Sequence, residues 1–242
     1  MTTVRSKTGA ITFGLIGYLF LVEIVSGILP GYYVPLISDL VKYPHIRDAD
    51  FNWFEAARLL LSALVVPILA KLGDMFGHKR ILLVSTVLTA GASWALVLAD
   101  SFTTFLIAWA PQGFSVVWLP LEVALIFDRG RSMGRGASQT RRAAGFLVVA
   151  LKAGAIIGAL LGGRVFGWFG NSVPLTLTIP AIAVTLVFFA VLFGVPESTP
   201  LPGRRLDVVG FSMLTLGLLL ITSGLSSGLS FLRLNGLDAW WV

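Results

Sequence analysis

The stretch ILLVSTVLTAGASWALVLA, residues 81–99, contains no charged side chain at any of its 19 positions. A helix needs about 20 mostly apolar residues, each rising about 1.5 Å, to cross the hydrocarbon core of a bilayer. Other stretches of this kind, each with at most two charges, cover residues 10–37, 53–70, 102–127, 143–166, 173–195 and 208–232. The first is too long for the apolar core of a signal peptide. The sequence therefore predicts an all-α membrane protein with seven transmembrane helices.

The composition supports a membrane protein and excludes several other classes. Of the 242 residues, 56% are hydrophobic and only 12% are charged, which is about half the charged share of a soluble domain. The absence of cysteine excludes thiol catalysis and thiolate metal sites, and two histidines, His45 and His78, are too few for a metal centre. We expect no metal, no cofactor and no enzymatic activity, because no Ser/His, His/Glu or paired-Asp constellation lies within the spans.

The net charge of +6 is explained by basic residues that flank membrane spans, so we expect the lipid bilayer and not nucleic acid as a partner. With the N-terminus in the cytoplasm, twelve of the 18 Lys and Arg residues lie in cytoplasmic segments and four outside. Arg58 and Lys152 lie within spans. Because cytoplasmic loops are enriched in Lys and Arg, we predict a multi-pass protein of the cell (inner or plasma) membrane with a cytoplasmic N-terminus.

The proline-rich segment PESTPLPG, residues 196–203, is the clearest boundary in the chain. Residues that precede proline are displaced from the helical conformation. We therefore predict an N-terminal six-helix transmembrane bundle over residues 1–196 and a cytoplasmic Pro-rich linker over 197–207. Residues 208–242 would hold the seventh transmembrane helix and a truncated C-terminal segment.

The loop between the second and third spans reads AKLGDMFGHKR, residues 70–80. Asp74 follows a helix that ends at the cytoplasm, where it can hold basic groups or the N-terminus of a neighbouring helix. Gly77 permits a tight reversal, and Lys79 and Arg80 anchor the next span at the anionic lipid surface. The simpler interpretation is a positively charged loop with a turn glycine.

Span five carries GAIIGALLGG, in which Gly154, Gly158, Gly162 and Gly163 follow a four-residue spacing. Glycines at this spacing share one helix face and let another backbone approach closely. A generic packing stripe is the alternative interpretation, since Gly27 and Gly31 in span one follow the same spacing.

These motifs resemble those of the major facilitator superfamily. The loop matches the family signature Gly-x-x-x-Asp-Arg-x-Gly-Arg-Arg/Lys at Asp74, Gly77 and Lys79, and it departs from it at Ala70, Met75 and His78. The resemblance implies that this loop holds the two halves of a transporter together in the outward-facing state.

The glycines of span five resemble the antiporter signature Gly-x-x-x-Gly-Pro-x-x-Gly-Gly, with Ala159 in place of the proline. In span four, Gln112 and Gly113 match the family stretch Arg-x-x-Gln-Gly, but Trp109 occupies the position of the arginine that is linked to proton coupling. A neutral indole cannot replace a permanent cation, which places coupling through this residue in question.

The segment from the linker through Gly210 resembles the start of span seven in the fourteen-helix drug:proton antiporter branch. The resemblance covers the first half of such a transporter, whose members bind substrate between two bundles at mid-membrane. The expected partner is therefore a missing C-terminal half or a second copy of the chain. We expect a truncated gene product or a fragment, and a dimerising half-transporter is the alternative.

Four ionisable residues lie within the spans and are candidates for the substrate or proton pathway, because each costs about 2.5–3.5 kcal/mol on insertion. Glu23 lies in span one, where the resemblance places the transport cavity. Glu122 and Lys152 are expected to form an ion pair between helices, either structural or part of a proton relay. Arg58 can extend toward the outer interface or pair with Glu55, one turn before it.

The sequence thus favours a secondary active transporter that exports a hydrophobic or cationic small molecule, coupled to protons. An uncoupled or importing permease and a non-transporting half-length membrane module are the alternatives. The aromatic residues expected near the cavity are Phe13, Tyr18, Phe20, Tyr32, Tyr33, Trp109 and Trp118.

Overall fold

The computed structural model describes residues 13–42, 51–131 and 136–198, together with 209–210, 212–214, 216–218 and 220–221. The chain divides into two compact units, Met1–Arg204 and Arg205–Val242. In the second unit the described residues are helical. Most of the predicted linker (197–207) and of the predicted seventh span (208–232) lies outside the described residues, so both stay predictions.

Within the described residues, six helical segments are long and apolar enough to cross a membrane, which confirms the first six predicted spans. They are Gly14–Lys42, Phe51–Phe76, His78–Val97, Phe102–Gly130, Thr140–Trp168 and Val173–Gly194. The helices that build them are α1 (Phe13–Tyr33), α2 (Ile37–Lys42), α3 (Phe51–Phe76), α4 (His78–Val97), α5 (Phe102–Trp109), α6 (Trp118–Arg131), α7 (Gly136–Trp168) and α8 (Val173–Gly194).

The cytoplasmic loop predicted over residues 70–80 is shorter than expected. Helix α3 continues to Phe76, and α4 begins at His78, so only Gly77 connects them. Charged residues such as Lys71 and Asp74 mark the membrane surface, but a helix whose backbone hydrogen bonds are internal can extend past that surface. Gly77 has a φ of +102°, a conformation that favours glycine.

The fourth span is a helix of three parts. Ser101 and Thr104 form a capping box at the start of α5, in which Ser101 N donates to Thr104 Oγ1 at 3.0 Å. The tighter 3₁₀ helix η3 (Ala110–Val117) then connects α5 to α6. Pro111 contributes to this change, because it has no N–H for the α-helical hydrogen bond.

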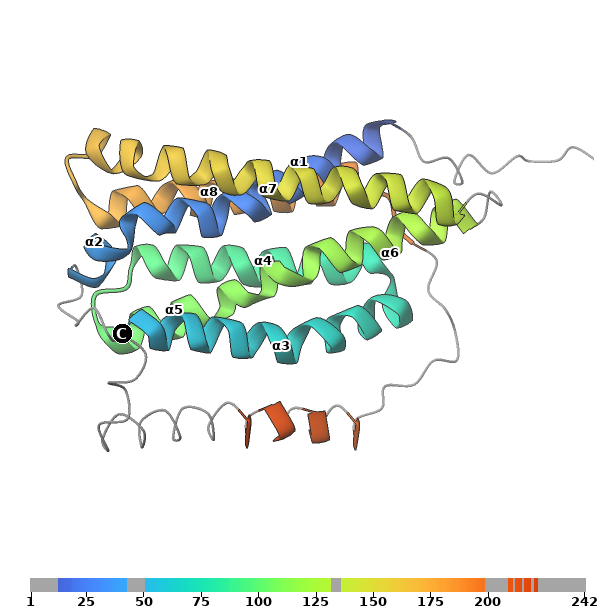
Figure 1. The fold of residues 1–242 in the computed structure, drawn as a ribbon, viewed down its shortest axis with the longest axis horizontal. Helices are drawn as coiled ribbons and strands as arrows, with labels where there is room; N and C mark the ends of the chain where they lie inside the picture. The colour runs from blue at the N-terminus through green and yellow to red at the C-terminus, as the bar shows by residue number, and fades with distance from the viewer. Residues whose placement is uncertain are drawn as a thin grey trace, which may run out of the picture. The chain divides into compact units, whose positions relative to one another are not determined.

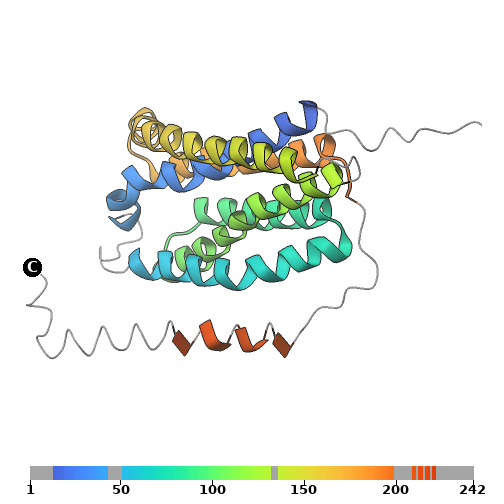
Figure 2. The ribbon, with the colours of Figure 1, turned by 45° about the vertical axis from the view of Figure 1, so that its right-hand side comes forward.

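The helices form two groups that pack side by side (Figure 1). Helix α1 lies along α7 and next to α8, whereas α3 packs on η3 and α4. The turned view agrees: α1, α7 and α8 remain together in Figure 2, apart from α3. Contacts of α4 with α8 and of α6 with α7 join the two groups.

Two apolar clusters fill the bundle. One includes Leu19, Leu82 and Leu125, at the predicted cytoplasmic end, and the other includes Phe54 and Trp109, at the predicted outer end.

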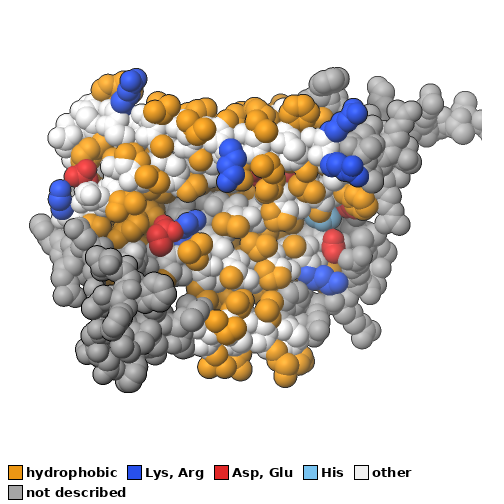
Figure 3. Space-filling view, in the orientation of Figure 1, with side chains coloured by type: hydrophobic (Ala, Val, Ile, Leu, Met, Phe, Trp, Pro, Cys, Tyr) orange, Lys and Arg blue, Asp and Glu red, His pale blue; other side chains and the backbone are white. Residues whose placement is uncertain are grey.

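The outer face of the bundle is apolar, as a lipid-facing surface requires. Large hydrophobic side chains such as Leu98, Phe146 and Leu160 are exposed. Figure 3 shows hydrophobic side chains over the middle of this face, with most Lys and Arg side chains toward its two ends.

Candidate functional site

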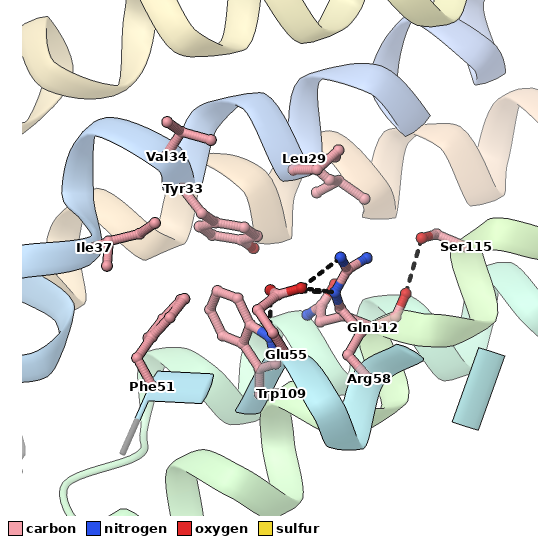
Figure 4. Close-up of a pocket in the computed structure, with 11 residues that line it drawn as sticks. Leu29, Tyr33, Val34, Ile37, Phe51, Glu55, Arg58, Trp109, Gln112 and Ser115 are labelled. Carbon is pink, nitrogen blue, oxygen red and sulfur yellow. Dashed lines mark hydrogen bonds and ion pairs between the residues drawn. The ribbon is translucent and has the colours of Figure 1, made fainter. Parts of the chain in front are cut away.

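A cavity of about 180 Å³ lies between α1, α3 and the α5–η3 segment, toward the predicted outer end of the bundle. Figure 4 shows the side chains that line it, with those of α3 and η3 facing those of α1. The polar lining comes from Tyr33, Glu55, Arg58, Gln112 and Ser115. The apolar and aromatic lining comes from Leu29, Pro30, Val34, Ile37, Phe51 and Trp109.

Glu55 and Arg58 form an ion pair in this cavity, and the indole of Trp109 also binds Glu55. Arg58 Nη2 donates to Glu55 Oε2 at 2.7 Å, and Arg58 Nε donates to the same oxygen at 3.1 Å. Trp109 Nε1 donates to Glu55 Oε1 at 3.1 Å. Of the two alternatives for Arg58, the structure thus shows the pairing with Glu55. Trp109 occupies the position where the family motif has arginine. Trp109 and Arg58 both donate hydrogen bonds to the carboxylate of Glu55, which connects the two side chains.

The rest of the span-four motif holds α5 and η3 against their neighbours. Gln112 Nε2 donates to Ser93 Oγ at 3.0 Å, which ties η3 to α4. Gly113 lies against α3, because a Cβ at this position would be 2.6 Å from Arg58 O and 2.7 Å from Ser62 Oγ. The glycine thus brings η3 close enough to α3 for Trp109 to reach Glu55.

Two buried carboxyl groups lie deeper in the bundle. Glu23 of α1 and Glu122 of α6 are both 0% exposed, and none of their carboxyl oxygens has a hydrogen-bond partner among the described residues. Helices α1 and α6, which carry these two residues, contact each other, and the charge of Glu23 acts unfavourably on that of Glu122. The arrangement is unusual, because buried ionisable groups in a membrane are normally paired.

The predicted ion pair between Glu122 and Lys152 is wrong. Lys152 is exposed on α7, and the Glu122 carboxyl has no hydrogen-bond partner in the part of the chain that the structure describes. The prediction used only the depth of each residue along its own helix. It ignored rotation about the helix axis, which turns Glu122 inward beside Glu23 and Lys152 outward.

The glycine motif forms the contact between α1 and α7. A Cβ on Gly154, Gly158 or Gly162 would overlap backbone carbonyl oxygens of α1, those of Ile24, Ile28 and Tyr32 respectively. In return, Gly27 and Gly31 of α1 face the backbone of Leu151 and Ala155. Gly163 lies off this contact, with its nearest neighbour Pro35 Cβ at 3.9 Å.

The cytoplasmic motif, residues 70–80, joins the ends of four spans. The imidazole of His78 lies between two carboxylates, with Nε2 at 3.5 Å from Asp74 Oδ1 and Nδ1 at 3.3 Å from Asp128 Oδ2. The backbone N–H of His78 donates to Ser198 Oγ at 2.6 Å. These contacts link the α3–α4 turn to the end of α6 and to the segment after α8.

The other basic residues of the motif bind the end of α8. Lys79 Nζ donates to Leu192 O at 2.9 Å, as expected for a cation at a helix C-terminus. Arg80 Nε lies 3.4 Å from Glu197 Oε2, and a Cβ at Gly77 would be 2.6 Å from the other oxygen of the same carboxylate.

Sequence patterns did not indicate several residues of these sites. Phe51 lies next to a break between spans, and Ser198 lies in the segment that follows α8. Their partners, such as Trp109 and His78, are more than fifty positions away. Of the aromatic residues expected at the cavity, Tyr33 and Trp109 line it, whereas Tyr32 and Trp118 are buried elsewhere in the core. Within the described residues, no three His, Asp or Glu side chains lie together in a way that could hold a metal ion.

Residues 19–237 match the family model described as Major Facilitator Superfamily. The chain is 31% identical over 195 residues to the cephamycin export protein CmcT of Amycolatopsis lactamdurans, covering 77% of this chain and 39% of that protein. It is 30% identical over 173 residues to the multidrug export protein EmrB of Haemophilus influenzae, covering 69% and 32%.

A longer match extends to the uncharacterized MFS-type transporter YwoD of Bacillus subtilis, with 24% identity over 225 residues. It covers 86% of this chain and 47% of that protein, so the chain spans less than half the length of these relatives. Among solved structures, the human organic anion transporter MFSD10 (TETRAN) shares the fold, with a TM-score of 0.63 and 17% identity over 83% of this chain and 52% of the other.

Proposed function

The chain belongs to the major facilitator superfamily of membrane transporters, and we propose that it forms the N-terminal half of a proton-coupled exporter of amphipathic small molecules. Its six described spans supply one bundle, and transporters of this architecture bind substrate between two bundles that rock against each other. A C-terminal half or a second copy of the chain would complete the pathway. The matches to proteins named for multidrug export and cephamycin export support export as the direction.

The observation that carries this proposal is the pair of unpartnered carboxyl groups, Glu23 and Glu122. Two buried carboxyl groups that repel each other and have no hydrogen-bond partner among the described residues are costly inside a membrane. The bundle can lower this cost by protonating the carboxyl groups or by binding a cationic group of a substrate beside them. When one site takes either a proton or a substrate, the binding of one expels the other, and this linkage drives exchange in opposite directions.

The cytoplasmic contacts of His78, Lys79 and Arg80 support the rocking motion that export requires. They tie the ends of α3, α4, α6 and α8 together, so that this bundle moves as one body. A hinge would then lie outside these helices, in the connection to the second bundle. The family resemblance assigns this motif to the closed cytoplasmic side of the outward-facing state.

The test uses the full-length protein in proteoliposomes, with ethidium as a lipophilic cation probe and an imposed pH gradient. We expect ethidium transport to follow the gradient in the wild type and to be lost in Glu23→Gln, with unchanged protein insertion. Asp100→Asn, which removes an exposed carboxylate from the α4–α5 connection, is the matched control and should transport normally. Gradient-driven transport at the wild-type rate in Glu23→Gln would remove this residue from the mechanism.

A second candidate function is an uncoupled permease of the same fold. Trp109 favours it, because the indole at this position donates a hydrogen bond to Glu55 and carries no charge. If the wild type transports ethidium at the same rate with and without the pH gradient, this result would support the uncoupled permease instead.

A further inference from the structure

The hydroxyl group of Tyr33 has no partner. Tyr33 is 6% exposed, and its oxygen makes no hydrogen bond to any of the described residues. Its neighbour Tyr32 is equally buried, but the Tyr32 hydroxyl donates to Thr176 O at 3.0 Å. A buried hydroxyl without a partner is costly. In Figure 4 the ring of Tyr33 extends into the cavity, toward the Glu55–Arg58 pair.

The guanidinium of Arg58 offers a second unused donor in the same cavity. Its Nε and Nη2 donate to Glu55, whereas Nη1 makes no hydrogen bond within the described part of the chain. Glu55 holds the planar group along one edge and leaves the other edge available. A guanidinium held in this way can receive a second acceptor without losing the first.

The carboxylate that lines the cavity, that of Glu55, is already paired. Both oxygens of Glu55 accept from Arg58, and Oε1 also accepts from Trp109. The side chain of Gln112 is bonded to Ser93, with Gln112 Nε2 donating to Ser93 Oγ at 3.0 Å. Arg58 Nη1 and the Tyr33 hydroxyl are thus unused donors beside a carboxylate that is already paired, and they favour a ligand that brings acceptors.

Aromatic rings form the wall beside these donors. Trp109 lies at the centre, with the ring of Tyr33 at 4.9 Å and that of Phe51 at 5.4 Å between centroids. A cavity of about 150 Å³ lined by apolar side chains can bind benzene, and this one measures about 180 Å³. The space accommodates one aromatic ring with a small polar group.

We propose that this cavity binds the carboxylate end of an aromatic or similarly apolar ligand, with Arg58 Nη1 and the Tyr33 hydroxyl as its donors and Trp109 as its wall. The site is distinct from Glu23 and Glu122, which lie deeper in the bundle. The inference goes beyond the proposed function, which places a cationic group of the substrate beside Glu23 and Glu122, and it rests on that function only for the view that a carboxylate ligand is also a substrate. Binding itself is measured without transport.

The experiment titrates the full-length protein in detergent with benzoate, its neutral analogue benzamide and the cation benzylammonium, using isothermal titration calorimetry. We expect benzoate to bind about tenfold more tightly than benzamide, because only the carboxylate gains a charge-assisted hydrogen bond to Arg58. Benzylammonium should bind more weakly than either, since the free groups are donors.

The variants distinguish the loss of either donor from a general loss of folding. Tyr33→Phe removes only the hydroxyl and should weaken benzoate binding about threefold to tenfold, whereas Tyr32→Phe, one residue away and outside the cavity, should leave it unchanged. Arg58→Gln should remove the preference for benzoate over benzamide, and Arg58→Lys should retain part of it because the charge remains. Arg164→Gln, which removes an exposed cation from α7, is the charge-matched control.

Equal affinities for benzoate and benzamide in the wild type would overturn the proposal. It would also be overturned if the single variants Tyr33→Phe and Arg58→Lys both bound benzoate as tightly as the wild type. Benzoate affinity lost equally in Tyr32→Phe would also overturn it, since the effect would then not come from the cavity. None of these binding results would contradict the proposed function, which is tested separately by gradient-driven ethidium transport. Conversely, benzoate binding with no gradient-driven transport would contradict the proposed function alone.

Discussion

Glu55 and Glu122 both lie within membrane-crossing helices, yet among the described residues Glu55 has hydrogen-bond partners and Glu122 has none. Glu55 accepts hydrogen bonds from Arg58 and Trp109, at a position whose side chain is 34% exposed. Glu122 is fully buried beside Glu23 and has no hydrogen-bond partner in the described structure. At the residue scale, the carboxylate of Glu55 stabilises the bundle through its hydrogen bonds. The carboxyl group of Glu122 lowers the stability of the bundle and is a candidate for function.

Substitution by methionine should therefore have opposite effects at these two positions. Glu122→Met replaces an uncompensated buried polar group by an apolar side chain of similar size, so we expect a gain of about 1–2 kcal/mol in the free energy of unfolding. Glu55→Met leaves Arg58 and Trp109 without their acceptor and should cost about 1–2 kcal/mol, given its partial exposure.

Thermal unfolding of the purified protein in detergent measures both changes as shifts in Tm. If Glu122→Met lowers Tm as much as Glu55→Met does, Glu122 has a partner in the folded protein. A rise in Tm together with a loss of gradient-driven transport would instead show that stability is given up for function at this position.

At the scale of elements, the pairing of α1 with α7 depends on glycine in both helices. Gly27 and Gly31 on one side and Gly154, Gly158 and Gly162 on the other let the two backbones touch. In lipid, helices gain little from the hydrophobic effect and associate through close packing of this kind. The contact holds α1, with Glu23 and Tyr33, in a fixed position against the rest of the bundle.

Two glycines of the same motif should differ sharply on substitution. In Gly158→Ala the new methyl group would meet Ile28 O and lie 2.8 Å from Tyr32 N, both backbone atoms that cannot move aside. We expect a loss of about 1–3 kcal/mol, as for other overpacked sites.

Gly163→Ala is the matched control, since its methyl group would make only an ordinary contact with Pro35 at 3.9 Å. It should be neutral or stabilising by up to about 1 kcal/mol, because alanine favours the helix. Tm measurements in detergent compare the two variants. Equal losses would mean that α1 and α7 do not pack through this face.

At the scale of the whole molecule, the orientation of the bundle in the membrane is predicted from the distribution of Lys and Arg. Because cysteine is absent from residues 1–242, a single cysteine introduced here reports the side of the membrane without background from this part of the chain. Asp100 is exposed in the α4–α5 connection, predicted to be outside, and Arg141 is exposed near the start of α7, predicted to be cytoplasmic.

We expect a membrane-impermeant maleimide to label Asp100→Cys in intact cells and to label Arg141→Cys only after the membrane is permeabilised. The order of labelling follows from the excess of basic residues on the cytoplasmic side. The opposite order would reverse the topology, and the cavity at Tyr33 and Arg58 would then open toward the cytoplasmic side.

The amino-acid sequence alone determined the six described spans and the family resemblance. Apolar length is a local property, because each helix must satisfy its own backbone hydrogen bonds in lipid, and it can therefore be read one segment at a time. The i, i+3 pair of Glu55 with Arg58 was predictable for the same reason, since helix geometry alone brings such residues together.

Only the tertiary structure decided which residues meet across helices. Depth along a helix follows from residue number, but the direction of a side chain depends on how the helix is rotated in the bundle, and that rotation is set by packing with all its neighbours. For this reason Lys152 turned out to face outward, Glu122 to lie beside Glu23, and Trp109 to reach Glu55 across a contact that Gly113 permits. The cavity with its unused donors exists only because these rotations bring α1, α3 and η3 together.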